Sequence, residues 1–361
     1  MNYHKKIVVI VLLTTVLMLS LAQVHGTTSE LAGQTNVLSF LNNVAQIDTT
    51  QYTVHPVSYI VDYPTAFGGL AYAVGALNLT SANSELFVSY TTVNDALISC
   101  ELTVTSGSAA FTHEPADLLE NVKGFLERYQ SFAGASYVQA MPSMLSMIDI
   151  TKNATTTSGN IKLNVQNEEN FASINWMYTS NNVDFPSKGV GVTFKNGVFY
   201  DFGDGWNLYK VGSDKVQVSE QEAIDSAMAL AKDYKLIVGT GNGTTEVKFS
   251  IDTSHVDTIL TTIPREPLTL YPAWTVQLYF DEVYFTNYGF QARIWADTND
   301  VISFVPLSMG GTVTGDTQTS SSAIPTNNDT AFPTTTYLIG TITAIVITAA
   351  IAAVALKRRS K

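Results

Sequence analysis

Two short clusters of oxygen-bearing side chains are the residues of this sequence best suited to hold a cation. Asp201 and Asp204 flank one glycine, and Asp297, Asn299 and Asp300 lie within four positions. Ca²⁺ prefers several oxygen ligands on one short loop, which is the chemistry that both clusters offer. Neither has the spacing of an EF-hand, and Asp and Asn are also common turn residues. The four aspartates are therefore weak candidate ligands, and no metal or cofactor is predicted.

Catalytic motifs are not evident among the other reactive side chains. Residues 113–115, His-Glu-Pro, begin like a zinc-binding HExxH helix, but the second histidine is missing and the proline disfavours helix before it. The sequence has no GxSxG, and the glycine-rich run 239–244 lacks the last glycine of a dinucleotide fingerprint. A hydrolase with an unfamiliar site would need His113, Asp201 and Asp204 to converge in one pocket.

Aromatic residues near the end of the folded region are candidates for ligand recognition. Tyr284, Phe285 and Tyr288 fall in a predicted hairpin loop, where they would form a binding face for a sugar or peptide. Alternation in the preceding strand assigns Trp274 to the core. Packing in the core or within the loop is the other interpretation of the three loop aromatics.

The sequence contains four N-glycosylation sequons and a single cysteine. Asn78, Asn153, Asn242 and Asn328 each begin an Asn-x-Ser/Thr triplet, and all four are expected in loops or in the stalk, as glycosylation requires. Cys100 is the single cysteine, so no intrachain disulfide can form, and its alternating surroundings predict a buried thiol in a strand.

Both ends of the chain carry targeting signals. Residues 1–26 combine two lysines, a short apolar run and a small-residue exit, which predicts a cleaved signal peptide. Residues 337–356 form an uncharged stretch long enough to span a bilayer as a helix, and the basic tail 357–361 predicts a cytoplasmic C-terminus. The Thr- and Ser-rich segment 310–336 reads as a stalk. We expect a single-pass protein of the cell membrane with an extracellular ectodomain.

The formal charge of the ectodomain narrows the classes of partner that we expect. The ectodomain between the two apolar ends keeps 13 Lys and Arg residues against all 31 Asp and Glu residues, a formal charge of −18. An acidic surface of this kind is repelled by nucleic acid, so no nucleic-acid partner is predicted.

The ectodomain pattern predicts an α+β fold built from helices and antiparallel strands. We divide it into a β-rich segment, 27–112, and two helix-plus-sheet units, 113–214 and 215–309. Asn94-Asp95 and Asn196-Gly197 predict tight hairpin turns. Extended runs are expected at 52–61, 85–92, 97–105, 160–166, 171–179, 189–195, 198–202, 206–211, 244–251, 273–280, 288–296 and 301–305.

Helical spacing of apolar residues opens the β-rich segment, at Val37, Leu38, Leu41 and Val44, and it also marks the start of both later units. One amphipathic helix is predicted over 118–132, with a short second helix at 143–148. The next begins at Ser219, which forms a capping box with Glu222. A helix followed by antiparallel strands then occurs twice, at about 115–211 and 219–307, which predicts a degenerate internal repeat.

The second unit resembles the PepSY domain. The resemblance lies in the helix entry Ser219-Glu-Gln-Glu-Ala-Ile-Asp, in Tyr271-Pro-Ala-Trp-Thr-Val, and in the closing hairpin Ala292-Arg-Ile-Trp-Ala-Asp-Thr-Asn-Asp-Val-Ile. It covers about 90 of the 361 residues. Asn299-Asp300 replaces the family's usual glycine, although Asn tolerates a positive φ, and residues 252–270 form an apparent insert.

The resemblance implies a cystatin-like fold and a role in binding or inhibition rather than catalysis. PepSY modules occur in protease propeptides and in surface proteins, and the layout of the whole chain also resembles archaeal cell-surface proteins. Our first hypothesis is a membrane-anchored extracellular binding or regulatory module whose partner is a peptide, a protease or an envelope component. The alternatives are a structural or accessory glycoprotein of the cell envelope, for example of a surface layer, and the hydrolase described above.

Overall fold

The computed structural model describes residues 30–113, 117–240 and 243–309. The expected signal peptide (1–26), stalk (310–336), membrane span (337–356) and cytoplasmic tail (357–361) lie outside these residues, as do Asn242 and Asn328. Within the described residues, no helix has the length and apolar character needed to cross a membrane.

The fold is α+β, mostly antiparallel sheet with a few helices, and it forms two compact units. Unit 1 contains the described residues up to Met177 together with Lys188–Leu208. Unit 2 contains Tyr178–Ser187 and the described residues from Tyr209 onward. The chain therefore passes from one unit to the other three times.

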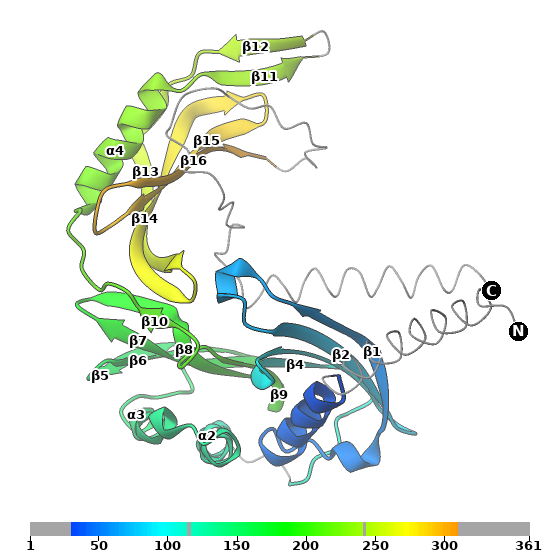
Figure 1. Cartoon of the computed structure of the whole chain (residues 1–361). Coiled ribbons are helices and arrows are strands. Elements are labelled where there is room, and N and C mark those ends of the chain that lie inside the picture. Colours follow the sequence, from blue (N-terminus) through cyan, green and yellow to red (C-terminus); the bar gives the residue numbers. More distant parts are fainter. Residues whose placement is uncertain (1–29, 114–116, 241–242, 310–361) are drawn as a thin grey trace, which may run out of the picture. The chain divides into compact units, whose positions relative to one another are not determined.

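Unit 1 is built on a nine-stranded sheet with the order β1-β2-β3-β4-β9-β8-β7-β6-β5 (Figure 1). Two meanders, β1–β4 and β5–β9, join where β4 pairs with β9 from Ser99↔Gly203 to Glu101↔Asp201. The strands are β1 Thr53–Asp62, β2 Tyr72–Thr80, β3 Glu85–Val93, β4 Ala96–Ser106, β5 Ala154–Ser158, β6 Ile161–Glu168, β7 Phe171–Ser180, β8 Val183–Lys195 and β9 Val198–Asp204.

Helices cover one face of this sheet (Figure 1). They are the helix over residues 30–43, α2 Leu118–Ala133, η3 Ser136–Ala140 and α3 Met141–Leu145; the short 3-10 turns η1 Thr49–Gln51 and η2 Thr65–Phe67 flank β1. The core between helices and sheet contains Phe40, Phe125, Trp176 and Phe202, each at most 1 % exposed. Burying such large side chains is what holds a disulfide-free unit together.

Unit 2 places α4 Glu220–Asp233 on a second sheet with the order β10-β14-β15-β16, to which β13 adds by pairing with β14. Its strands are β10 Lys210–Val211, β13 Ile251–Glu266, β14 Thr269–Tyr284, β15 Asn287–Trp295 and β16 Val301–Ser308, with a separate hairpin of β11 Leu236–Thr240 and β12 Gly243–Val247. Val276, Leu278 and Phe290 are buried in the core that contains the alanine face of α4. The capping box predicted at Ser219 and Glu222 is present.

The predicted tight turns are confirmed by the backbone. Asn94 and Asp95 have φ of 47° and 64°, and Asn196 and Gly197 have φ of 53° and 79°. Asn299 has φ of 64°, so an asparagine holds the position where a glycine is usual.

Several predicted elements differ from the structure. Strands β2 and β5 were not anticipated, and the apparent insert 252–270 is largely the long strand β13. Pro264 lies inside β13, which within the described residues pairs with β14 alone, and an edge strand tolerates proline. The expected strand 206–211 shrinks to Lys210–Val211, and the expected helix 143–148 is Met141–Leu145.

The helix-plus-meander pattern occurs three times rather than twice. Residues 30–106, 118–204 and 220–308 each begin with a helix and continue into antiparallel strands. The N-terminal segment expected to be β-rich thus has the same plan as the two units that follow it. The first two copies share one sheet.

Candidate functional site

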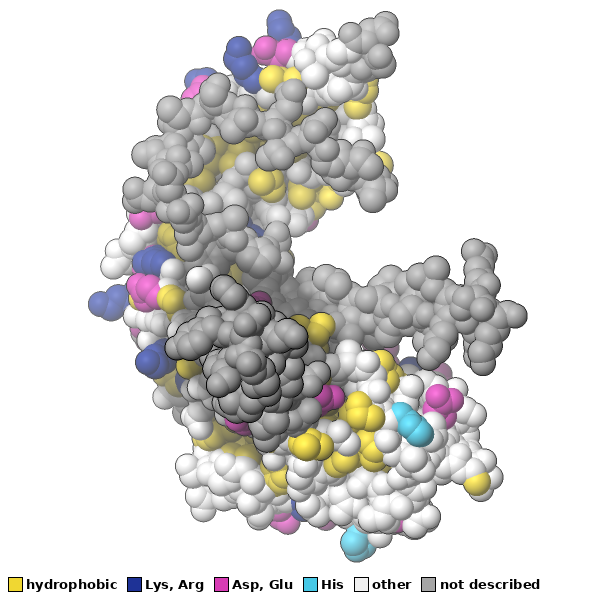
Figure 2. Space-filling model, turned by 45° about the vertical axis from the view of Figure 1, so that its right-hand side comes forward, with side chains coloured by type: hydrophobic (Ala, Val, Ile, Leu, Met, Phe, Trp, Pro, Cys, Tyr) yellow, Lys and Arg dark blue, Asp and Glu magenta, His cyan; other side chains and the backbone are white. Residues whose placement is uncertain are grey.

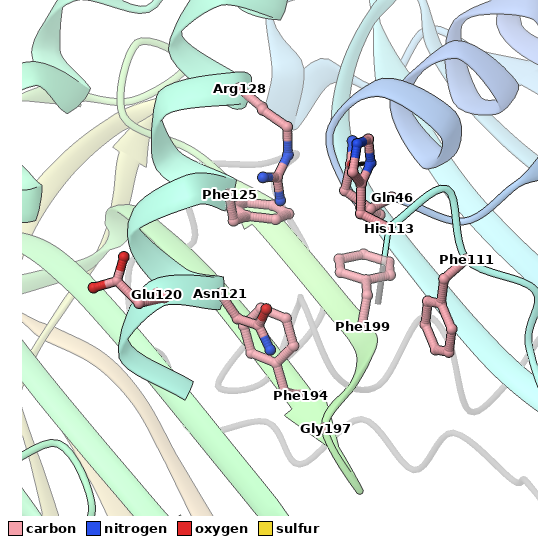
Figure 3. Close-up of a pocket in the computed structure, with 11 residues that line it drawn as sticks. Gln46, Phe111, His113, Glu120, Asn121, Phe125, Arg128, Phe194, Gly197 and Phe199 are labelled. Atoms are coloured by element: carbon pink, nitrogen blue, oxygen red, sulfur yellow. Dashed lines mark hydrogen bonds between the residues drawn. The ribbon is translucent and has the colours of Figure 1, made fainter. Parts of the chain in front are cut away.

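A pocket of about 490 Å³ opens in unit 1 where four segments meet (Figure 3). These are the turn after the helix 30–43, the chain after β4, the first three turns of α2, and the β8–β9 hairpin. The tight turn at Asn196-Gly197 brings Phe194 and Phe199 of that hairpin to the pocket wall. This volume lies in the range of small-ligand sites in proteins.

The floor of the pocket is aromatic. Phe125 of α2 stacks on Phe199 with ring centroids 6.0 Å apart and meets Phe194 edge to face at 6.5 Å. Phe111 completes the apolar lining. Phe125 and Phe199 are 1 % and 2 % exposed, so they form the buried base of the floor, and Phe111 is the more accessible ring. An apolar guest would be favoured to the extent that it covers the apolar surface that remains accessible.

Gln46 organises the polar side of the pocket. Its Oε1 accepts hydrogen bonds from Thr112 Oγ1 at 2.9 Å and from His113 Nδ1 at 2.8 Å, and its Nε2 donates to the Asn43 carbonyl at 3.1 Å. An amide oxygen only accepts, so the proton of His113 is placed on Nδ1 and Nε2 is left as the acceptor of the neutral ring. His113 is therefore oriented by Gln46.

Arg128 is the cation of the pocket. Its Nε donates to the Val44 carbonyl at 2.9 Å, at the end of the helix 30–43. Partial burial lowers the pKa of the guanidinium, against a small opposing effect of Glu127. In the described residues no carboxylate forms an ion pair with Arg128, so its terminal nitrogens are available to a ligand.

His113, Asp201 and Asp204 do not converge. His113 borders the pocket. Along β9, Phe202 points into the core beneath the helices, so alternation puts Asp204 on the helix side of the sheet and Asp201 on the other side. The arrangement that would have favoured a hydrolase is not formed by these residues.

Asp204 belongs to a hydrogen-bonded cluster. Its Oδ2 accepts from the hydroxyls of Tyr129 and Tyr137, and its Oδ1 accepts from the backbone N–H of Trp206 at 2.9 Å. Burial and the Asp204 charge raise the pKa of both tyrosines, so they stay neutral donors. Tyr137 stacks on Trp206 at 5.7 Å. The cluster fastens α2 and η3 to the end of β9.

Asp201 lies opposite Glu101 on the helix-free face of the sheet. Burial, and then the neighbouring Glu101 carboxylate, raise the pKa of Asp201 to about 7. Tyr200 donates to Glu101 Oε1 at 3.0 Å, which holds the second acid in place. The pair is a strained contact between two acids of adjacent strands.

The acids of the last turn serve unit 2. Asp297 pairs with Arg265, whose guanidinium lies between the rings of Tyr271 (4.3 Å) and Trp295 (4.1 Å). Asp300 is exposed, and its carbonyl accepts from Trp295 N at 2.9 Å. Among the described residues, no group of three or more His, Cys, Asp and Glu side chains comes together as a metal site. On the face shown in Figure 2, acidic and basic side chains are interspersed.

The three loop aromatics separate. Tyr284 packs edge to face on Phe280 at 5.5 Å, at the core beneath α4. Tyr288 stacks on Tyr279 of the opposite, helix-free face at 6.3 Å. Phe285 is 61 % exposed at the turn between β14 and β15. The structure therefore does not bring all three to one face.

The two described sequons differ in setting. Asn78 lies inside strand β2 and is partly buried, although a loop was expected. Asn153 is exposed just before β5, and its Oδ1 accepts from Asn167 N at 2.7 Å. Cys100 is buried in β4 as predicted, and burial raises its thiol pKa well above the usual value.

Arg128, Gln46 and the aromatic floor were not recognised as a site from the sequence. One signal was present: Asn121, Phe125 and Arg128 are spaced i, i+4, i+7, so they share one face of α2. Phe111 and His113 lie shortly before α2, but Gln46 and the β8–β9 hairpin are far from it in the sequence, and no local spacing connects them to α2.

Comparisons with known proteins leave the chain without an assigned family. No family model matches it. No curated protein sequence matches it either. Among solved structures, the C-terminal domain of Bacillus megaterium YpeB is similar over 77 % of this chain and 96 % of that chain, with 11 % identity and a TM-score of 0.29. At that TM-score the likeness carries no argument about fold or function.

Proposed function

We propose that this chain is a membrane-anchored extracellular binding or regulatory module of PepSY type that acts without catalysis. The observation that carries the proposal is the pocket of unit 1, which pairs an aromatic floor with one fixed cation, Arg128. Apolar walls with a few placed polar groups are typical of sites that bind. The helix-plus-meander plan of each copy agrees with the PepSY resemblance of residues 219–307.

The proposed partner is a peptide, a protease or another component of the cell envelope. The anchor, residues 337–356, would keep the binding site at the cell's own surface, with the stalk 310–336 setting its distance from the bilayer. A role as a structural envelope glycoprotein is the competing outcome of the test below.

Thiol labelling of intact cells tests the topology. Cys100 is buried, so it contributes little background to a membrane-impermeant reagent. A cysteine introduced as Ser320→Cys should be labelled on intact cells, and one introduced as Ser360→Cys only after the membrane is opened. Labelling of both, or of neither, before opening would contradict the proposed orientation.

Quantitative cross-linking on the same cells tests the binding role. The full chain should cross-link to a defined envelope component at a stoichiometry well below that of a surface lattice. Recovery of the chain as an abundant, regularly self-cross-linked array would instead favour the structural role.

A further inference from the structure

Among the described residues that line the pocket of unit 1, one cation lacks an acidic partner. Glu120 is the lining acid, but its Oε1 lies 3.3 Å from Lys123 Nζ. In Figure 3 the Glu120 carboxylate points away from Arg128 and from the aromatic floor. The charge that a guest would meet above the phenylalanines is therefore positive.

Arg128 is held in position before any ligand arrives. Its Nε is tied to the Val44 carbonyl, and its guanidinium lies along α2 in the space above Gly124. A Cβ at residue 124 would come within 2.8 Å of Arg128 Nη1. Glycine inside a helix costs about 1 kcal/mol relative to alanine, and here it makes room for the guanidinium. A pre-positioned side chain loses less conformational entropy when a ligand binds.

Arg128 is the group of the pocket wall that favours an anion. Gln46 uses its carbonyl oxygen and its amide nitrogen within the wall. Arg128 keeps two terminal nitrogens for a ligand, in the fork geometry that matches a carboxylate. Glu120 also lines the pocket, and its carboxylate is paired with Lys123.

We propose that this pocket binds a carboxylate attached to an apolar or aromatic side chain, as at the C-terminal residue of a peptide. The side chain would lie against Phe111 and Phe194, and the carboxylate would pair with Arg128. A free amino acid also carries an ammonium group beside its carboxylate, which the charge of Arg128 would repel, so an acylated residue is the better guest. This proposal rests on the binding role proposed above and names its ligand chemistry.

Binding of short acetylated peptides to the purified full chain tests the proposal. Tetrapeptides ending in Phe are measured by calorimetry with a free C-terminal carboxylate and with a C-terminal amide. The acid form should bind at least tenfold more tightly than the amide, because a charge-assisted pair in a half-buried site is lost in the amide. N-acetyl-phenylalanine and free phenylalanine are compared in the same way, and the acetylated form should bind more tightly.

Two variants separate the pocket from the general charge of unit 1. Arg128→Gln keeps a donor near Val44 but removes the charge, so it should reduce the acid-to-amide preference to about one. Lys152→Gln removes an exposed charge that pairs with Asp149 outside the pocket, and it should keep the preference. Far-UV circular dichroism and thermal unfolding confirm that both variants fold.

The comparison of acid and amide peptides on the wild-type chain tests the proposed carboxylate site even if Arg128→Gln does not fold. Equal binding of acid and amide, or binding of neither, overturns the proposal. A preference for small N-acyl acids over peptides would assign the same chemistry to a free metabolite. If no peptide or acid binds but a cross-linked envelope partner is found, the ligand chemistry fails and the proposed binding role stands.

Discussion

At the scale of single residues, the acid pair in the middle of the large sheet is the clearest source of pH dependence. Glu101 and Asp201 sit on adjacent strands, and the raised pKa of Asp201 means that the folded chain binds a proton more tightly there than the unfolded chain does. The corresponding stability is fully present below about pH 4, the ordinary range of an aspartate, and is lost as the pH rises through about 7.

Asp201→Asn should therefore stabilise the protein at high pH. The neutral amide removes the burial and repulsion of a second carboxylate, and after allowance for solvent screening we expect a gain of about 2 kcal/mol at pH 8. The difference from wild type should shrink toward pH 4. Thermal unfolding at pH 4, 6 and 8 measures it, and a variant that is less stable than wild type at pH 8 would show that the carboxylate is a favourable partner.

At the scale of elements, the start of α4 depends on a reciprocal pair of hydrogen bonds. Ser219 Oγ accepts from Glu222 N, and Glu222 Oε2 accepts from Ser219 N at 2.8 Å. Ser219→Ala removes the cap, and we expect a loss of about 1 kcal/mol in the free energy of unfolding. Chemical denaturation measures it. Ser226→Ala on the same helix is the control, because the Ser226 hydroxyl donates to the exposed Asn299 side chain. An equal loss of stability in Ser226→Ala would show that the cap has no special effect.

Elements with strong local signals were predicted from the sequence. The spacing of α2, the capping box of α4 and the turns at Asn94-Asp95 and Asn196-Gly197 are encoded by neighbouring residues, and the structure confirms them. Strand β13 was missed because prolines such as Pro264 and Pro267 are rare inside strands. Proline is tolerated in an edge strand, and the position of β13 in the sheet is set by its pairing with β14, not by its neighbours in the sequence.

The site was less predictable than the elements for the same reason. Phe125 and Arg128 share a helical face, but nothing local says that Gln46 and Phe199 lie across from them. Asp201 and Asp204 looked like one cluster in the sequence, yet strand alternation sends them to opposite faces of the sheet. Pockets made from distant segments follow from topology, which the sequence suggested only in outline.

At the scale of the whole molecule, residues 178–187 belong to unit 2, although β7 begins in unit 1 and β8 ends there. Val183 and Phe185 of this segment are buried with Leu270, and the Phe185 ring lies 5.7 Å from Tyr178. Phe185→Ala would leave a cavity and should cost about 3–5 kcal/mol.

Differential scanning calorimetry on the full chain would show which unit is affected. Phe185→Ala should lower the same unfolding transition as Gly289→Ala, where a Cβ would meet the Leu278 carbonyl oxygen at 2.3 Å. Leu86→Ala, in the core of unit 1, should lower a different transition. If Phe185→Ala and Leu86→Ala lowered one transition together, the assignment of residues 178–187 to unit 2 would be wrong.

The three crossings of the chain have a consequence for inheritance. No single uninterrupted stretch of the gene encodes unit 2 completely, because its first ten residues are embedded in the coding region of unit 1. A recombination event that transferred residues 209–309 alone would give a product in which Leu270 no longer packs against Val183 and Phe185. The two units are thus expected to be gained, lost and exchanged between genomes as one piece, despite having separate cores.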